Sequence, residues 1–223
     1  MRLANGDTSL QYPGDNVRYT PSFNTMSAAV APGSSAARKV RRPRPFTVDE
    51  FYRLAQTGFF GPEHKRLELV GGEILEPLPI GPAHAAAVTR LHSMFSQRLG
   101  QRFVVRSQNP IRLDEFSEPQ PDLTVLRYRA DFYRDAHPKP EDVVLLIEVA
   151  DTTLEFDLGD KARVYASAGI SEYWVLDLTG ERVRVFRRPD QGEFTETRIA
   201  GPDQSLEPRE LPGFSVTVRE LFG

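Results

Sequence analysis

The sequence predicts an α/β (α+β) domain, in which β-strands and α-helices alternate along the chain. The run from Val143 to Ala150 is apolar apart from one glutamate, which is typical of a strand covered on both faces. The segment from Phe156 to Ala168 follows it and repeats inward-facing residues at helical spacing. The Gly71-Gly72 pair lies between two alternating segments, which indicates a two-residue β-hairpin.

The other elements are expected from capping, periodicity and turn signals. Thr47 and Glu50 are spaced as a capping box, so a helix should begin there and end near Gly58. The remaining predictions are, in chain order, a helix over 82–99, short strands over 103–107 and 111–113, a strand over 121–126, a strand over 172–177, outer strands over 182–186 and 194–199, and a closing segment over 214–222.

Charge divides the 223 residues into a tail and one domain. Residues 1–44 carry seven basic and two acidic residues, lack periodicity and are rich in small and polar residues, so we expect a disordered basic tail there. The folded domain should span residues 45–223, with a net charge near −8. The basic cluster between Arg38 and Arg44 could contact phosphates, although a solvated arm is the more common role of such a run. The acidic domain disfavours a broad DNA-binding face.

Composition excludes several classes of site. The chain has no cysteine, which excludes disulfides, thiolate nucleophiles and cysteine-based zinc sites. The sequence contains no P-loop, no G-x-G-x-x-G, no G-x-S-x-G elbow and no His-Glu-x-x-His motif. It also lacks a secretory h-region and any apolar run of about 20 residues that could span a membrane. We therefore expect a soluble, cytoplasmic protein with no membrane partner.

Charged residues break the inward-facing patterns at three places. Glu148 lies within the apolar strand, Lys161 interrupts the apolar stripe of the following helix, and Asp122 opens another strand. An unpartnered buried carboxylate costs several kcal/mol, so Glu148 requires a partner. Carboxylate oxygens suit Mg²⁺ or Mn²⁺, which activate water and neutralise a phosphodiester, and a lysine can stabilise the transition state. A purely structural Glu148–Lys161 ion pair is the alternative.

Two further candidates precede these residues. With Gly71-Gly72 as the turn, Val70 faces Glu73, and Glu68 and Glu73 share one face of the hairpin as diagonal neighbours. We expect both glutamates to point toward Asp122, although alternation alone is equally compatible with a solvent-facing pair. His84 lies in the first turn of the helix over 82–99 and could reach a site there, whereas a lone histidine is more often structural.

From Phe46 to Phe222 the chain resembles the Uma2 family of endonucleases, within the PD-(D/E)XK restriction-endonuclease-like superfamily. The resemblance depends on motifs that are specific only in combination and in this order. They are Glu68-Leu69-Val70-Gly71-Gly72-Glu73, His84 before a helix, Pro121-Asp122, Leu146-Ile147-Glu148-Val149, Asp157-Leu158-Gly159-Asp160-Lys161 with Tyr165, and Gly169-Ile170-Ser171-Glu172-Tyr173-Trp174.

The resemblance implies a restriction-endonuclease-like fold, a mixed central β-sheet flanked by helices. It implies that Asp122 and Glu148 are metal ligands for Mg²⁺ or Mn²⁺, and that Glu73, Glu68 and His84 match family positions near the site. The superfamily usually places a lysine two residues after its second acid, where this chain has Ala150, so Lys161 would supply the ammonium instead.

The implied function is metal-dependent endonucleolytic hydrolysis of DNA phosphodiester bonds, with DNA as the substrate and a homodimer as one possible assembly. A catalytically inactive DNA-binding or assembly module that retains the fold is the alternative. An enzyme acting on another phosphate ester is a third interpretation.

Overall fold

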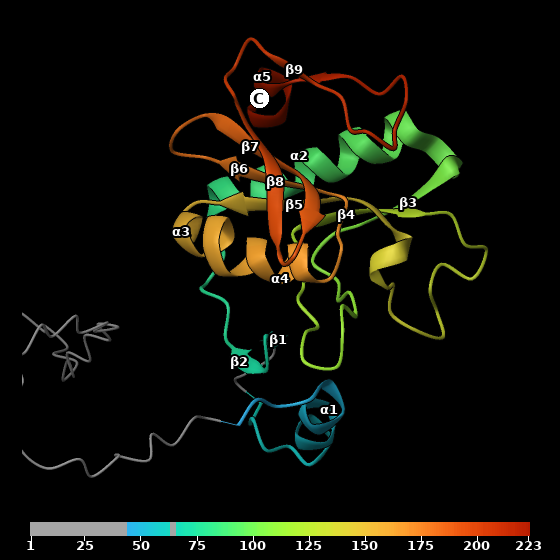
Figure 1. The fold of residues 1–223 in the computed structure, drawn as a ribbon, viewed down its shortest axis with the longest axis vertical. Helices are drawn as coiled ribbons and strands as arrows, with labels where there is room; N and C mark the ends of the chain where they lie inside the picture. The colour runs from blue at the N-terminus through green and yellow to red at the C-terminus, as the bar shows by residue number, and fades with distance from the viewer. Residues whose placement is uncertain (1–43, 63–65) are drawn as a thin grey trace, which may run out of the picture. The chain divides into compact units, whose positions relative to one another are not determined.

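The computed structural model describes residues 44–62 and 66–223 (Figure 1). The predicted tail, apart from Arg44, lies outside the described residues. The first described element is α1 (Val48–Gln56), which opens with the predicted capping box of Thr47 and Glu50 and is followed by Gly58 at a φ of +72°. This helix is therefore confirmed at both ends.

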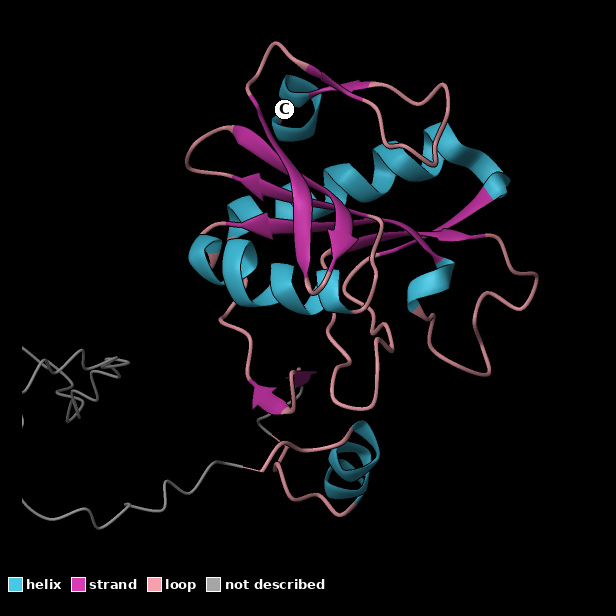
Figure 2. Cartoon of the chain, in the orientation of Figure 1, coloured by secondary structure: helices cyan, strands magenta, loops and turns pink. Residues whose placement is uncertain are grey.

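A six-stranded mixed sheet forms the centre of the domain, in the order β3-β4-β5-β6-β7-β8 (Figure 2). Adjacent strands are antiparallel except β5 and β6, which are parallel. The strands are β3 (Phe103–Arg106), β4 (Leu123–Arg127), β5 (Val143–Ala150), β6 (Glu172–Asp177), β7 (Arg182–Asp190) and β8 (Glu193–Ala200). Every residue of β5 is buried, which confirms that this strand is covered on both faces.

Helices cover the two faces of this sheet (Figure 1). α2 (Pro82–Leu99), which has the predicted bounds, packs with Leu145 and Ile147 in one core cluster. The other face carries a helical segment built from α3 (Leu154–Phe156), the π-helix η3 (Asp157–Lys161) and α4 (Ala162–Ser167). Since side chains alternate along a strand, Leu146, Glu148 and Ala150 face this second layer. The predicted mixed sheet flanked by helices is confirmed.

Short elements complete the domain. The 3₁₀ turns η1 and η2 precede β3 and β5, and a two-stranded sheet with a closing helix ends the chain. The bounds are Gly100–Arg102 for η1, Pro140–Asp142 for η2, Ser205–Leu206 for β9, Val216–Thr217 for β10 and Val218–Phe222 for α5. Within the described residues no helix has the length and apolarity needed to cross a membrane.

The predicted hairpin consists of β1 (Glu68–Val70) and β2 (Glu73–Leu75) and has the expected register, with Glu68 opposite Leu75 and Val70 opposite Glu73. Both turn glycines have positive φ, +59° at Gly71 and +81° at Gly72, as a tight two-residue hairpin turn requires.

The predicted strand over 111–113 is wrong. Ile111 and Leu113 donate backbone hydrogen bonds to Pro119 and Ser117, whereas the intervening Arg112 donates to Pro138. Because the bonds go to two separate loops, no regular ladder forms.

Candidate active site

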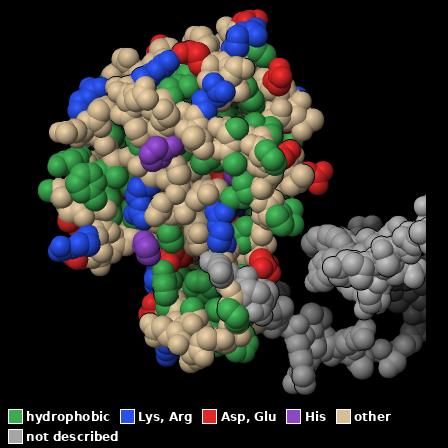
Figure 3. Space-filling view, turned by 180° about the vertical axis from the view of Figure 1, so that it is seen from behind, with side chains coloured by type: hydrophobic (Ala, Val, Ile, Leu, Met, Phe, Trp, Pro, Cys, Tyr) green, Lys and Arg blue, Asp and Glu red, His purple; other side chains and the backbone are tan. Residues whose placement is uncertain are grey.

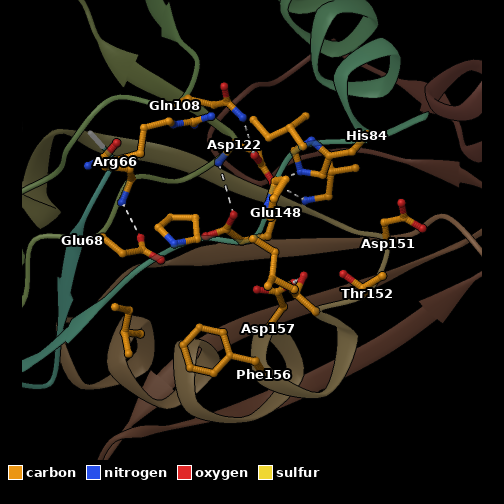
Figure 4. A pocket seen from close by; sticks show the side chains of 18 of the residues that line it. Arg66, Glu68, His84, Gln108, Asp122, Glu148, Asp151, Thr152, Phe156 and Asp157 are labelled. Carbon is orange, nitrogen blue, oxygen red and sulfur yellow. Dashed lines mark hydrogen bonds and ion pairs between the residues drawn. The ribbon is translucent and has the colours of Figure 1, made fainter. Parts of the chain in front are cut away.

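Asp122 and Glu148 meet because of the register between β4 and β5. Leu123 pairs with Ile147 in this antiparallel ladder, so the residue before Leu123 lies beside the residues after Ile147. The Val149 amide donates to Asp122 Oδ2 at 2.9 Å, and the Asp122 amide donates to Glu148 Oε2 at 3.2 Å (Figure 4). The backbone thus holds the two carboxylates side by side at the end of the buried strand.

Glu148 receives its other hydrogen bonds from the helical layer. Lys161 Nζ donates to Glu148 Oε1 at 3.0 Å, and the Tyr165 hydroxyl donates to the same oxygen at 2.7 Å. The predicted contact between Lys161 and Glu148 is therefore confirmed. Burial raises the pKa of Glu148 to about 8, with Lys161 opposing this shift and the Asp122 and Asp157 carboxylates adding to it.

Lys161 is the buried cation of this cluster. Its ammonium also lies 3.5 Å from Glu68 Oε1, and its side chain is 9% exposed. Burial alone would lower the pKa of Lys161, but the Glu148, Glu68 and Asp157 carboxylates outweigh it and hold the pKa above its ordinary value. The lysine consequently stays charged, and one ammonium faces several carboxyl groups.

Asp122 is held in its ionised form. It accepts hydrogen bonds from His84 Nε2 at 3.0 Å and from Gln108 Nε2 at 3.2 Å. Burial works against the charged form of Asp122, yet the hydrogen bond and charge of His84 outweigh it and lower the pKa of the carboxyl. The same hydrogen bond, opposed by burial, raises the pKa of His84. In the described structure, His84 Nδ1 is buried and has no hydrogen-bond partner.

These residues line one pocket of about 440 Å³. One part of its wall carries the carboxylates, and another is formed by the loop over 76–81 that leads from β2 into α2. Figure 4 shows Asp122, Glu148 and Asp157 among the residues that line this pocket.

Comparison with known proteins places this chain in a family. The sequence model described as "Uma2: Putative restriction endonuclease" matches residues 48–219. The chain belongs to the Uma2 family. Among solved structures, the chain is similar to "a putative nuclease belonging to DUF820 from Anabaena variabilis ATCC 29413", with 19% identity and a TM-score of 0.62. The match covers 80% of this chain and 98% of that chain, and at this identity it shows the fold. No curated protein sequence matches the chain.

The donor set of this Uma2 site fits a hard divalent cation. In the ranges 44–62 and 66–223, no three histidine or acidic side chains form a ready-made metal cage. Mg²⁺, however, is usually held by one or two carboxylates, with waters and substrate phosphate completing its shell. Asp122 Oδ1 and Glu148 Oε2 each accept one hydrogen bond, which leaves acceptor capacity on both carboxylates. The neighbouring Asp122, Asp157 and Glu68 carboxylates, which add to the rise that burial causes in the pKa of Glu148, also favour a bound cation.

The structure brings Glu68 to the site but not Glu73. Glu68 is buried beside Lys161 and accepts the Gln120 amide at 3.0 Å. Glu73 is exposed and does not line the pocket, although it has the predicted pairing. The hairpin is short, so Glu73 lies directly after its turn. There the Gly72 carbonyl accepts a backbone hydrogen bond from Phe46, and the Gly72 amide donates one to Phe116. The turn is therefore held by residues outside the site, and Glu73 lies beside it.

Asp157 is a pocket residue that the sequence reasoning did not single out. It is 3% exposed and accepts the Thr153 hydroxyl at 2.6 Å. Burial raises the pKa of Asp157 to about 6, while Lys161 and the Thr153 hydrogen bond oppose the shift. Its spacing of four residues from Lys161 was the available signal, since residues so spaced share one helix face. The π-turn that holds both residues is a feature often found at functional sites.

Proposed function

We propose that this Uma2 protein is a metal-dependent endonuclease that hydrolyses DNA phosphodiester bonds. Asp122 and Glu148 are the proposed metal ligands, Lys161 the stabilising cation, and His84 the residue that orients Asp122. The observation that carries the proposal is the meeting of the two carboxylates at the end of β5, with the buried Lys161 ammonium 3.0 Å from Glu148. Membership of the family supports the same reaction class.

A bound Mg²⁺ or Mn²⁺ would lower the pKa of a coordinated water and neutralise charge on the phosphate. The chain's own residues do the rest. Lys161 has three donors, of which two are directed at Glu148 and Glu68, so the third can bind a phosphate oxygen as charge develops in the transition state. His84 Nε2 fixes the rotation of the Asp122 carboxylate and keeps it ionised. Tyr165, whose pKa is raised by burial and by Glu148, remains a donor to Glu148.

The test is cleavage of plasmid and oligonucleotide DNA by the full-length protein in Mg²⁺, in Mn²⁺ and in a chelator. We expect cleavage with either metal, none in the chelator, and none in Asp122→Asn or Lys161→Met. Mn²⁺ binding by calorimetry should disappear in Asp122→Asn and persist in Lys161→Met. Arg163→Met, on the same helical segment but exposed, is the matched control and should cleave normally. Equal cleavage by all variants would refute the assignment.

A second candidate is a DNA-binding or assembly module without catalysis. It is favoured by the partners that Glu148 already has, since this buried carboxyl accepts hydrogen bonds from Lys161, Tyr165 and the Asp122 amide. A carboxylate held in this way can serve as a structural ion pair alone. Under this alternative the protein binds neither Mn²⁺ nor Mg²⁺ at the pocket, and DNA added to it stays intact.

A further inference from the structure

The loop over 76–81 presents apolar side chains to the candidate active site. Leu78 is 62% exposed and Ile80 is 40% exposed, and both line the pocket that contains Asp122 and Glu148. Pro77 and Pro79 flank Leu78 and restrict the backbone on both sides of it. Single exposed apolar side chains are ordinary on protein surfaces. Leu78 and Ile80, however, line the same pocket as the carboxylates.

The pocket has apolar lining residues as well as charged ones. Phe156 also lines it, with its ring centroid 5.9 Å from Lys161 Nζ. The apolar side chains that line the pocket are those of Leu75, Pro77, Leu78, Pro79, Ile80, Val149 and Phe156. A volume of about 440 Å³ lies within the range of about 300–1,000 Å³ that is typical of pockets for compact organic ligands. A metal ion with one phosphate needs no apolar wall, so a further part of the substrate should occupy this side.

The charge around the pocket argues against recognition through phosphates alone. The described lining includes six carboxylate residues but only Arg66 and Lys161 as permanent cations. On the face shown in Figure 3, Lys and Arg side chains lie in small separate groups among acidic residues, not in one continuous track. Duplex binding depends mainly on neutralising phosphates along the backbone, whereas bases can also bind by stacking on apolar and aromatic surfaces.

We propose that the Leu78–Ile80 loop and Phe156 form a subsite for an unpaired nucleobase next to the scissile phosphate, so that the substrate is single-stranded or locally unpaired DNA. This inference rests on the proposed nuclease function. The nucleotide that carries the scissile phosphate also carries a base, and Leu78, Ile80 and Phe156 line the same pocket as the proposed metal ligands. In an intact duplex that base is paired and stacked, and extruding it costs free energy that an unpaired strand does not require.

The first test compares kcat/KM on one oligonucleotide sequence presented as a single strand, as a perfect duplex and as a duplex with an unpaired loop. We expect single-stranded and looped DNA to be cleaved at least tenfold faster than the duplex. Leu78→Ser combined with Ile80→Ser should lower kcat/KM on the single strand by about 5- to 30-fold, the lower part of the range for loss of one stacked base, because Phe156 remains in place. Phe132→Ser, which alters a residue that is 63% exposed and does not line the pocket, should stay within twofold of the unaltered protein.

The second test does not require cleavage. Full-length protein in chelator is titrated with single-stranded DNA that carries 2-aminopurine at successive positions. We expect a fluorescence change at one position, lost in the Leu78→Ser, Ile80→Ser protein and kept in Phe132→Ser. Equal cleavage of duplex and single strand, with no effect of the double substitution, would overturn the subsite while leaving the nuclease proposal intact. If no DNA is cleaved under any metal condition, the nuclease proposal fails, and the fluorescence result alone decides whether the pocket binds a base.

Discussion

Replacing Lys161 with methionine removes a buried ammonium from the candidate site while keeping a side chain of similar length. In the folded protein this ammonium lies 3.0 Å from Glu148 and 3.5 Å from Glu68, and its side chain is 9% exposed. Removing one member of a buried ion pair generally costs about 3–5 kcal/mol, because the remaining charge stays buried without its partner.

Glu148 can avoid part of this cost by taking up a proton. Burial already raises its pKa to about 8, and loss of Lys161, which opposes that shift, raises it further. We therefore expect the lower end of the range, about 3 kcal/mol at about pH 8, and a smaller loss at about pH 5.5, where Glu148 is protonated in both proteins. For a domain of this size, about 3 kcal/mol corresponds to a fall in Tm of roughly 6–12 °C.

The assay is urea unfolding of both proteins at the two pH values, together with DNA cleavage. If Lys161 also stabilises the transition state, cleavage is lost at temperatures where the variant is fully folded. Arg163→Met should change stability by less than about 0.5 kcal/mol, because its ion pair with Asp160 is exposed. A Lys161→Met protein that is as stable and as active as the unaltered protein would refute both the structural and the catalytic reasoning.

Three other outcomes follow from the same cluster. In metal-free protein burial raises the folded-state pKa of Glu148 above its ordinary value of 4.5, so the folded state holds the proton more tightly than the unfolded chain. The contribution of Glu148 to stability therefore falls as pH rises from about 5 to about 8. Glu148→Gln should reduce the fall of the urea midpoint over that range, and the part that remains is expected from Asp157, whose pKa is also raised, to about 6. Tyr165→Phe removes a donor to the same carboxylate and should cost roughly 1–3 kcal/mol, measured as an unfolding free energy. Glu68→Gln should lower the Mn²⁺ affinity measured by calorimetry or the cleavage rate, because Glu68 lies beside Lys161 in the pocket. Glu73→Gln, at an exposed position, should leave both quantities unchanged.

Features that depend on local chemistry could be predicted from the sequence. The capping box at Thr47, the bounds of the helix over 82–99 and the register of the Gly71-Gly72 hairpin each follow from residues within one element. The contact of Lys161 with Glu148 was also predictable, because each residue breaks an otherwise apolar inward pattern and each needs the other. Buried charges in patterned elements are informative because they cannot remain unpaired.

Features that depend on how elements meet could not be predicted in this way. Glu73 has the expected register but is exposed, since register fixes the face of a hairpin and not how far the neighbouring pocket extends. The residues over 111–113 alternate as a strand does, yet their hydrogen bonds go to two separate loops. The π-turn that places Asp157 in the pocket adds one residue to a helical turn, and its cause lies in packing that the helical pattern does not contain.

If Lys161 is the stabilising cation that we propose, tertiary packing has replaced a sequence motif at this site. Ala150, two residues after Glu148, points to the same face of β5, where the usual lysine of the superfamily would stand. That face is closed, because Ala150 is 1% exposed and belongs to the same core cluster as Ala162 and Tyr165. A long charged side chain there would have to displace the very helical segment that covers Glu148. Lys161 lies on that segment and reaches Glu148 from above the strand, so the ammonium meets the carboxylate while the core beneath stays apolar. The chemistry of the site therefore constrains where the charge lies, and the packing of the helix on β5 determines which residue carries it.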